Sequence, residues 1–403
     1  MAPYESEDSQ GAGQSAARRK VVRYAVPVAV VGVAAAAIGL VPALADSGDP
    51  DLPKVTAREL IEKIAASDTE QLSGTVKIHT DLGLPALSGA ASAFGGVGGG
   101  GKGSSSADPK EKLTELASGT HTLRVAADGE DRQKLSMLDD ASEYSVIHNG
   151  DDLWAYDSAS DSAYHATADR HGSAAQRERG SRTPVTPKEL TDQILDAAGD
   201  HTSITVDGTA QVAGRDAYRL QIKPRQSGST VGAVTVSVDA RTGTPLKFTL
   251  TPAGGGAAVV DAGFTAVDFG RPAASTFDFK PAKGTEVTEA DDLPARDRPG
   301  KGHEEFKDAQ GLDGLKVVGA GWTSVAELKL PKEAAGLASG SGGGDLPGAA
   351  QKFLSSLGDQ VKGDFGTGTV YSTRLVNVLI TQDGTAYAGA VTKDALIKAA
   401  DAG

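Results

Sequence analysis

The 403-residue sequence contains no cysteine. This absence excludes disulfide bonds, thiolate metal sites, a cysteine nucleophile and the lipid-modified cysteine of a bacterial lipoprotein. Aromatic residues make up only 5% of the chain, which leaves little material for a surface on which bases could stack. The 40 basic side chains are outnumbered by 53 acidic ones, for a net charge of -13 at pH 7. Because phosphate binding needs a surplus of Lys and Arg, we expect no nucleic-acid partner.

The sequence also lacks catalytic and metal-binding motifs. No two of the seven histidines have metal-ligand spacing, and neither H-E-x-x-H nor G-x-S-x-G occurs. Gly96–Lys102 has the spacing of a phosphate-binding loop, but Gly103 follows where magnesium binding requires Ser or Thr. We therefore predict a non-enzymatic protein with no cofactor and no metal. A secreted hydrolase remains an alternative, which would require a strongly perturbed carboxylate or histidine in the fold.

One long uncharged run lies near the N-terminus, in residues 24–45. Residues 1–23 form a flank that ends in basic side chains, and the run closes on Ala43-Leu44-Ala45, a small-x-small cleavage signature. The run is either a cleaved secretory signal or a retained membrane anchor. Since the basic flank precedes it, both alternatives place residues 46–403 outside the cytoplasm.

Two helix starts share the same capping pattern. Thr56 is followed three residues later by Glu59, and Thr186 by Glu189, with Pro187 at the favoured first helical position. The segments that follow place apolar residues on one face. These residues are Leu60, Ile61, Ile64 and Ala65 in the first, and Leu190, Ile194 and Leu195 in the second.

Two series of alternating segments predict β-strands. The first series is Ser73–Thr80, Thr120–Ala126, Arg132–Leu138, Tyr144–Asn149 and Leu153–Asp157. The second is Ser203–Val212, Asp216–Lys223, Val231–Val238, Leu246–Thr251 and Ala257–Phe269. Long antiparallel meanders with two helices predict an α+β fold. Its main part is one large curved sheet that stays open, with helices over one face and an apolar interior.

Composition divides the rest of the exported part. A Gly-rich insertion at 89–107 interrupts a first domain of residues 46–293, and a second break at 294–302 precedes a small α+β unit at 303–403. For that unit we predict strands at Trp322–Leu330, Val370–Thr381 and Thr385–Val391, and helices at Gly348–Val361 and Lys393–Ala400.

Five motifs between about residues 55 and 290 resemble the LolA-like family of lipoprotein carriers. They are His121–Val125 with Gly129 and Arg132, Val146–Asp157 ("dG-x-x-LW-x-Y"), Val212–Leu220 with Pro224 ("v-G-R-x-a-Y-x-L"), Val238–Leu246 ("v-D-x-x-TG-x-PL"), and Phe277–Pro281 with Gly284 and Val287. The same motifs occur in RseB/MucB-type regulators of envelope-stress sigma factors, in which a smaller domain follows the LolA-like one.

The resemblance implies an open half-barrel with helices as a lid over an apolar cavity that holds acyl chains. Residues expected to line it are Val76, Ile78, Leu123, Val125, Leu153 or Trp154, Val234, Val236 and Val238. Which face of each strand points inward stays open, because several strands carry apolar groups on both faces. The alternative for each residue is that it only fills a core.

Two functions follow from the resemblance. The first is an exported cell-envelope protein that binds lipid or lipoprotein acyl chains as a carrier or chaperone. The second is a regulatory sensor that passes the signal of such a ligand to a membrane protein partner. A retained anchor would favour the sensor, since a carrier must leave the membrane.

Overall fold

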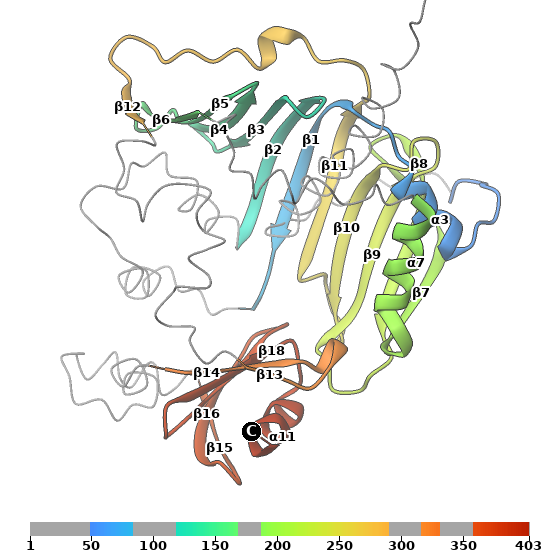
Figure 1. The fold of residues 1–403 in the computed structure, drawn as a ribbon, viewed down its shortest axis with the longest axis vertical. Coiled ribbons are helices and arrows are strands. Elements are labelled where there is room, and N and C mark those ends of the chain that lie inside the picture. Colours follow the sequence, from blue (N-terminus) through green and yellow to red (C-terminus); the bar gives the residue numbers. More distant parts are fainter. Residues whose placement is uncertain (1–48, 84–117, 168–186, 290–315, 331–357, 403) are drawn as a thin grey trace, which may run out of the picture.

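Two β-sheets dominate the computed structural model, which describes residues 49–83, 118–167, 187–289, 316–330 and 358–402 (Figure 1). The larger sheet has 12 strands and the smaller has six. Within the described residues the larger sheet does not close into a barrel. This arrangement confirms the predicted α+β class, in which a large open sheet with few helices precedes a small C-terminal unit.

The large sheet runs in the order β12-β6-β5-β4-β3-β2-β1-β11-β10-β9-β8-β7. Its strands are β1 (Gln71–Thr80), β2 (Gly119–Asp128), β3 (Arg132–Leu138), β4 (Glu143–Asn149), β5 (Asp152–Asp157), β6 (Ser162–Thr167), β7 (Thr202–Val212), β8 (Arg215–Pro224), β9 (Val231–Asp239), β10 (Pro245–Pro252), β11 (Val260–Asp268) and β12 (Glu286–Glu289). All ten predicted strands of this domain are present. Two short ones, β6 and β12, were not predicted.

The pairing of β1 with β11 joins the two predicted series into one sheet. Every pair in it is antiparallel except one. The short strand β12 runs parallel to β6 at the edge, so that Val287 lies opposite Ala163. Residues 270–285, which we call the closing strap, run from the end of β11 to β12 and so bring this last strand to the β6 edge of the sheet.

Helices α3 (Ala57–Ala65) and α7 (Pro187–Ala198) contact each other, and α3 lies against β7 and β8. The capping box predicted for α3 is present: the Glu59 backbone N–H donates to the Thr56 hydroxyl at 3.2 Å, and Thr56 N–H donates to the Glu59 carboxylate at 2.7 Å. The helix therefore begins where local sequence dictates. The second predicted cap, Thr186, lies outside the described residues.

The small sheet runs in the order β13-β14-β18-β17-β16-β15. Its strands are β13 (Lys316–Val318), β14 (Val325–Lys329), β15 (Gly358–Gly363), β16 (Gly366–Ser372), β17 (Asn377–Thr381) and β18 (Thr385–Gly389), and helix α11 (Lys393–Ala402) contacts β15, β17 and β18. The predicted final helix is confirmed.

Two predictions for this small domain were wrong. Residues 358–361, predicted as the end of a helix, belong to β15, and the predicted strand Val370–Thr381 is two strands joined by a turn. Gly358 explains the first error. A Cβ atom there would lie 2.3 Å from the Thr369 side chain, so a bare backbone lets β15 pair closely with β16.

Several predictions concern segments outside the described residues. These are the export segment 24–45, the Gly-rich insertion 89–107, the break 294–302 and residues 348–357 of the predicted helix. In the part of the chain that the structure describes, no helix is long and apolar enough to cross a membrane. The domain boundaries therefore stay predictions.

Candidate functional site

A continuous row of paired residues crosses the large sheet and fixes which side chains share a face. Ile78 on β1 lies opposite Ala262 on β11, and Ala262 lies opposite Phe248 on β10. Phe248 in turn lies opposite Val236 on β9. Because residues directly opposite each other in paired strands point to the same side, all four share one face, which we call the inner face.

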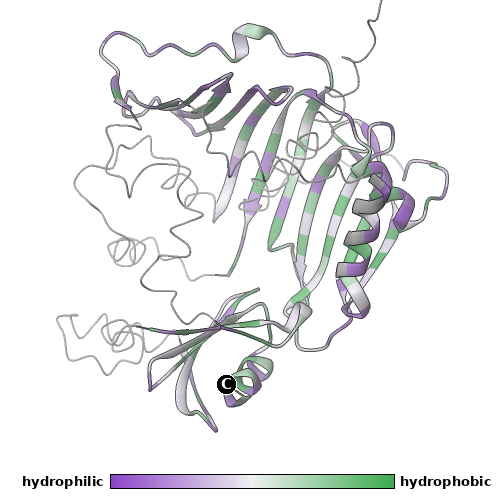
Figure 2. Cartoon of the chain, in the orientation of Figure 1, coloured by the Kyte–Doolittle hydropathy of each residue, from purple (hydrophilic) through white to green (hydrophobic). Residues whose placement is uncertain are grey.

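Most of the predicted ligand-binding residues belong to that face. Val76 follows Ile78 by parity on β1 and lies opposite Leu123 of β2, and Val125 is two residues further on. Val234 and Val238 flank Val236 by the same parity. The register thus brings together seven of the eight predicted residues, namely Val76, Ile78, Leu123, Val125, Val234, Val236 and Val238. Figure 2 shows the alternation of apolar and polar residues along these strands.

The apolar residues that the structure describes on the large sheet form two separate clusters, each with members on the inner face. The first, which we call the helix-covered cluster, joins Leu60 and Ile61 of α3 to Tyr218, Leu220 and Val238, and Val236 packs against it. Val238 therefore lies under a helix, where it serves as core. Val236 is half-buried against the same cluster.

The second cluster, which we call the strand cluster, lies mainly on β1–β4, β10 and β11. It includes Val76, Ile78, Leu123 and Val125, all buried, together with Met137, Tyr144, Val260, Ala262 and Phe264. Its described members come from strands and loops, and half-buried Leu135, Val146 and Leu250 pack against it. Four of the eight predicted residues therefore lie in an apolar region that is built separately from the helix-covered cluster.

Trp154 does not join the other seven residues. Val125 lies opposite Leu135, and across β4 that row continues through Val146 to Ala155. Trp154 immediately precedes Ala155 on β5 and so points to the outer face. Leu153, which was predicted as the alternative to Trp154, shares the inner face with Ala155. The prediction that Trp154 points inward was wrong, because apolar residues occupy both faces of this part of the sheet.

The outer face is apolar at Trp154 because the closing strap covers it. Phe279 of the strap lies 5.3 Å from the Trp154 ring and 5.2 Å from the Tyr156 ring, centroid to centroid, in both cases tilted. Phe277 is only 1% exposed. The "LW-x-Y" and "F-x-F-x-P" motifs therefore meet in space, although Trp154 and Phe279 are 125 residues apart in the chain, and they stabilise the strap by burying aromatic surface.

Polar contacts hold both ends of the strap. Arg271 Nε lies 3.1 Å from the buried carboxylate of Asp128, and Thr285 donates to Asp161 at 2.9 Å. At the far end, His165 stacks on Trp154 with centroids 4.0 Å apart. Its Nδ1 lies 2.8 Å from Glu289 on β12, and its Nε2 lies 3.1 Å from Asp152 on β5. His165 therefore links the edge strand to the sheet.

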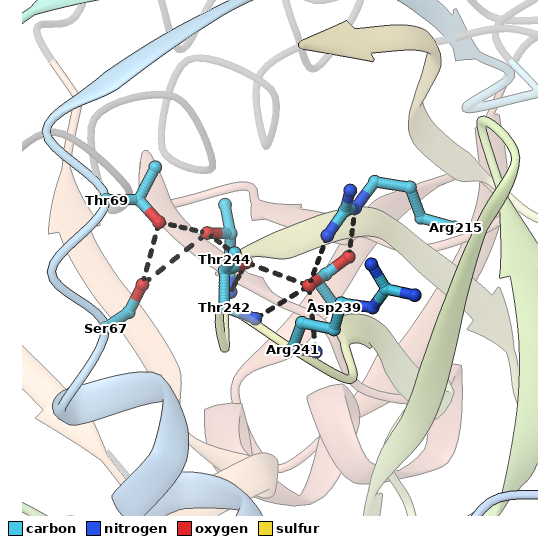
Figure 3. A network of polar contacts seen from close by, with 7 residues as sticks. All are labelled: Ser67, Thr69, Arg215, Asp239, Arg241, Thr242 and Thr244. Atoms are coloured by element: carbon cyan, nitrogen blue, oxygen red, sulfur yellow. Dashed lines mark hydrogen bonds and ion pairs between the residues drawn. The ribbon is translucent and has the colours of Figure 1, made fainter. Parts of the chain in front are cut away.

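A polar network at the β9–β10 turn unites two further motifs (Figure 3). Arg215 holds the Asp239 carboxylate with two nitrogens, and the second, Nη2, lies 3.0 Å from Oδ1. Arg215 also lies 4.6 Å above the Phe269 ring. Asp239 Oδ1 accepts from Thr242 N–H at 2.7 Å and from Arg241 N–H at 3.0 Å. The Arg of "G-R" and the Asp of "D-x-x-TG" are thus an ion pair that shapes the β9–β10 turn.

The same turn contacts the segment between α3 and β1. Thr244 lies 2.8 Å from Thr69 and 3.5 Å from Ser67, hydroxyl to hydroxyl. Gly243 has φ +76, and a Cβ atom there would lie 2.4 Å from the Lys63 carbonyl oxygen. Only glycine fits both the conformation and the approach. The "TG" motif therefore docks the end of α3 against the sheet.

Electrostatics agree with a structural role for Asp239. Burial by itself would raise the pKa of this carboxyl, but hydrogen bonds from Arg215, Thr242 and Arg241 outweigh burial and hold the pKa below its ordinary value. An ionised carboxylate with this many donors is a fixed acceptor rather than an acid or base. Among the described residues, no group of three His, Asp or Glu side chains could hold a metal ion.

Comparisons with known proteins found no matching family model and no matching curated protein. Solved structures that match include the Pseudomonas aeruginosa MucA/MucB complex, at 17% identity and TM-score 0.37, covering 85% of this chain and 96% of that one. An uncharacterized conserved protein from Thermus thermophilus matches at 10% identity and TM-score 0.31, covering 58% and 98%. A LolA superfamily protein from Nitrosomonas europaea matches at 10% identity and TM-score 0.21, covering 56% and 99%. At these identities and TM-scores the matches say nothing about what this chain binds.

Proposed function

We propose that this chain is a non-catalytic, exported cell-envelope protein that binds lipid or lipoprotein acyl chains on the strand cluster of its inner face, as a carrier or chaperone. The observation that carries the proposal is the separation of the two clusters. Helix α3 packs on the helix-covered cluster, while the strand cluster presents a second apolar region on the same face. Its half-buried members Leu135, Val146 and Leu250 are the residues best placed to contact a ligand.

The physical driving force is ordinary apolar burial. Each CH₂ group removed from water contributes about 0.8 kcal/mol, so a long acyl chain needs neither charge pairing nor covalent chemistry. The residues that the described strands supply to the inner face at this place, such as Leu135 and Val146, fit such a chain.

Native mass spectrometry with organic extraction, on residues 46–403 purified from the envelope of the native host, tests this proposal. Two neighbouring half-buried residues of β10 provide matched variants. Leu250 points to the inner face, opposite Val234, and Thr249 points to the outer face, opposite Thr235. We expect acyl lipid to co-purify with the natural protein and with Thr249→Asn, and to be lost from Leu250→Asn. A folded natural protein that carries no lipid and takes up none would overturn the proposal.

The alternative function is a regulatory sensor that reports the ligand to a membrane protein partner. The observation that favours it is the docking of the small domain on the large sheet, where Leu375 of the small domain packs against the strand cluster. In-cell photo-crosslinking from the exposed residue Val317 on edge strand β13 tests it. A ligand-dependent crosslink to a membrane protein would support the sensor, and an unchanged pattern with and without ligand would favour the carrier.

A further inference from the structure

The turn between β16 and β17 of the small domain is held rigidly by its own hydrogen bonds. Thr373 N–H donates to the Val376 carbonyl at 3.0 Å, and the Thr373 hydroxyl donates to the same oxygen at 2.8 Å. That hydroxyl also accepts from Val376 N–H at 2.8 Å and from Leu375 N–H at 3.2 Å. One threonine thus fixes the backbone on both sides of Leu375.

Residues of the large domain bind the same turn at several points. Arg374 N–H donates to the Leu82 carbonyl at 2.8 Å, and Arg374 Nη1 lies 2.6 Å from the Asp81 carboxylate. Arg374 Nη2 donates to the Ala257 carbonyl, and the Thr230 hydroxyl donates to the Leu375 carbonyl. The backbone on both sides of the Leu375 side chain is therefore attached to the large domain. The Arg374 N–H binds just after the end of β1, and the Leu375 carbonyl binds just before the start of β9.

Further hydrogen bonds between the two domains fix their relative position. Thr230 N–H donates to the Ala390 carbonyl at 3.0 Å, and Thr392 N–H donates to the Gly228 carbonyl at 2.7 Å. Trp322 Nε1 donates to the Thr202 hydroxyl at 2.9 Å. Backbone and side-chain bonds distributed along the interface resist rotation of one domain against the other, so Leu375 has one defined position.

That position is at the end of the strand cluster. The side chains of Leu375 and Leu82 both pack against this cluster, which includes Ile78 and Val260. Val260 lies opposite Thr80, the last residue of β1, so the contact is made where the inner face ends at the small domain. A residue of the second domain therefore bounds the apolar surface that the first domain provides.

We infer that Leu375 sets the length of the acyl chain that the inner face accepts, as a wall that the small domain places across the end of the strand cluster. This inference rests on the proposed function. It also gives the small domain a direct part in ligand binding. A shorter side chain at position 375 extends the apolar surface, and a larger one shortens it.

Binding measurements with saturated fatty acids of about 12 to about 18 carbons test the wall. Leu375→Ala should move the preferred length upward by about two carbons. Because each further buried CH₂ is worth about fourfold in affinity, the longest chains gain most. Leu375→Phe should move the preference the other way. Ile397→Ala is the matched control, since Ile397 of α11 packs on the core of the small domain and has the same kind of half-buried apolar side chain.

Arg374→Ala provides a second variant that leaves Leu375 itself unchanged. It removes the contacts to Asp81 and Ala257, so the wall should move and the length preference should broaden. Identical length profiles for the natural protein and all three variants at Leu375 and Arg374 would overturn the wall while leaving the proposed function intact. Failure of every fatty acid to bind the natural protein would overturn both.

Discussion

The two parts of the large sheet use the same inner face in different ways. In the part formed by β7–β9, Leu60 and Ile61 of α3 are buried against Tyr218, Leu220 and Val238. In the part formed by β1–β6, the described covering segment is the closing strap, and it packs Phe279 on the outer face instead. The first part has a helix over its inner face, whereas the second has a strap behind it.

This difference shows that the parity of a strand fixes a face but not what covers it. Val238 and Val125 share the inner face by register, yet Val238 belongs to the helix-covered cluster and Val125 to the strand cluster. A segment packed behind β4–β6 stabilises these strands without occupying their inner side. We therefore expect substitutions in the two parts to separate stability from ligand binding.

The largest loss of stability should come from the ion pair of the helix-covered part. Asp239→Ala leaves Arg215 without its partner and removes the acceptor for two backbone N–H groups, at a side chain that is 1% exposed. We expect a loss of about 3 to 5 kcal/mol in the free energy of unfolding, measured by urea denaturation. Asp207→Ala is the control, because its exposed carboxylate lies 4.0 Å from Arg219 and should cost about 0 to 1 kcal/mol. Equal losses would contradict the structural role of Asp239.

The second largest loss of stability should come from truncating the contact between α3 and the sheet. This variant should also show that the two clusters have different roles. Leu60 of α3 is 1% exposed, and Leu60→Ala leaves a cavity that should cost about 2 to 5 kcal/mol. At a temperature where the variant is folded, its acyl binding should match that of the natural protein. If Leu60→Ala loses the ligand as completely as Leu250→Asn does, the two clusters act as one site, and their separate roles in stability and binding are contradicted.

The strap should contribute less, because its contacts are partly exposed. Phe279→Ala removes both ring contacts to Trp154 and Tyr156, and we expect a loss of about 1 to 2 kcal/mol for this half-buried ring. Hydrogen exchange measured by mass spectrometry should show faster exchange in β12 and β6, with α3 unchanged. Faster exchange in α3 instead would mean that the strap supports the helix-covered part.

The smallest effect concerns acid sensitivity on the outer face of β4. Burial by itself would raise the pKa of Glu143, but hydrogen bonds from Ser136 and Ser145 and the charges of Lys134 and Arg124 hold that pKa below its ordinary value. A lowered folded-state pKa stabilises the fold above the unfolded value, near 4.3, and the contribution disappears as pH falls through the folded-state value. Glu143→Gln should therefore cost at most about 1 kcal/mol at neutral pH and nothing in acid. A loss of stability in Glu143→Gln that grows as pH falls would contradict a lowered pKa for Glu143.

Local signals in the sequence predicted much of the fold. The Thr56 cap is a contact between residues three apart, and it is present as expected. The strands of the large sheet follow from alternation. Residues 358–361 were assigned to a helix because Gly358 carries no strand signal, whereas its close approach to Thr369 depends on a neighbouring strand. Such an approach is not visible in one segment alone.

The candidate site depended on pairings between distant segments. The shared face of Ile78 and Val236 follows only from the β1–β11 pairing, which joins residues more than 180 apart in the chain. Trp154 points outward because Phe279 covers it. A signal for this existed, since Phe277 and Phe279 flank Asp278 in a segment that was not predicted as a strand, and aromatic side chains there favour packing on another element. The position of Leu375 could not be predicted, because it requires the docking of two domains.

Photo-crosslinking with two fatty acids, one that carries a diazirine in mid-chain and one that carries it at the chain end, followed by peptide mapping, identifies the residues that contact the acyl chain. We expect the mid-chain probe to label Leu135, Val146 and Leu250 on the inner face, and the chain-end probe to label Leu82 and Leu375. Outer-face residues of the same strands, such as Lys77 and Thr249, should stay unlabelled. Labelling confined to the outer face or to the aromatic contact between Trp154 and Phe279 would contradict binding on the inner face.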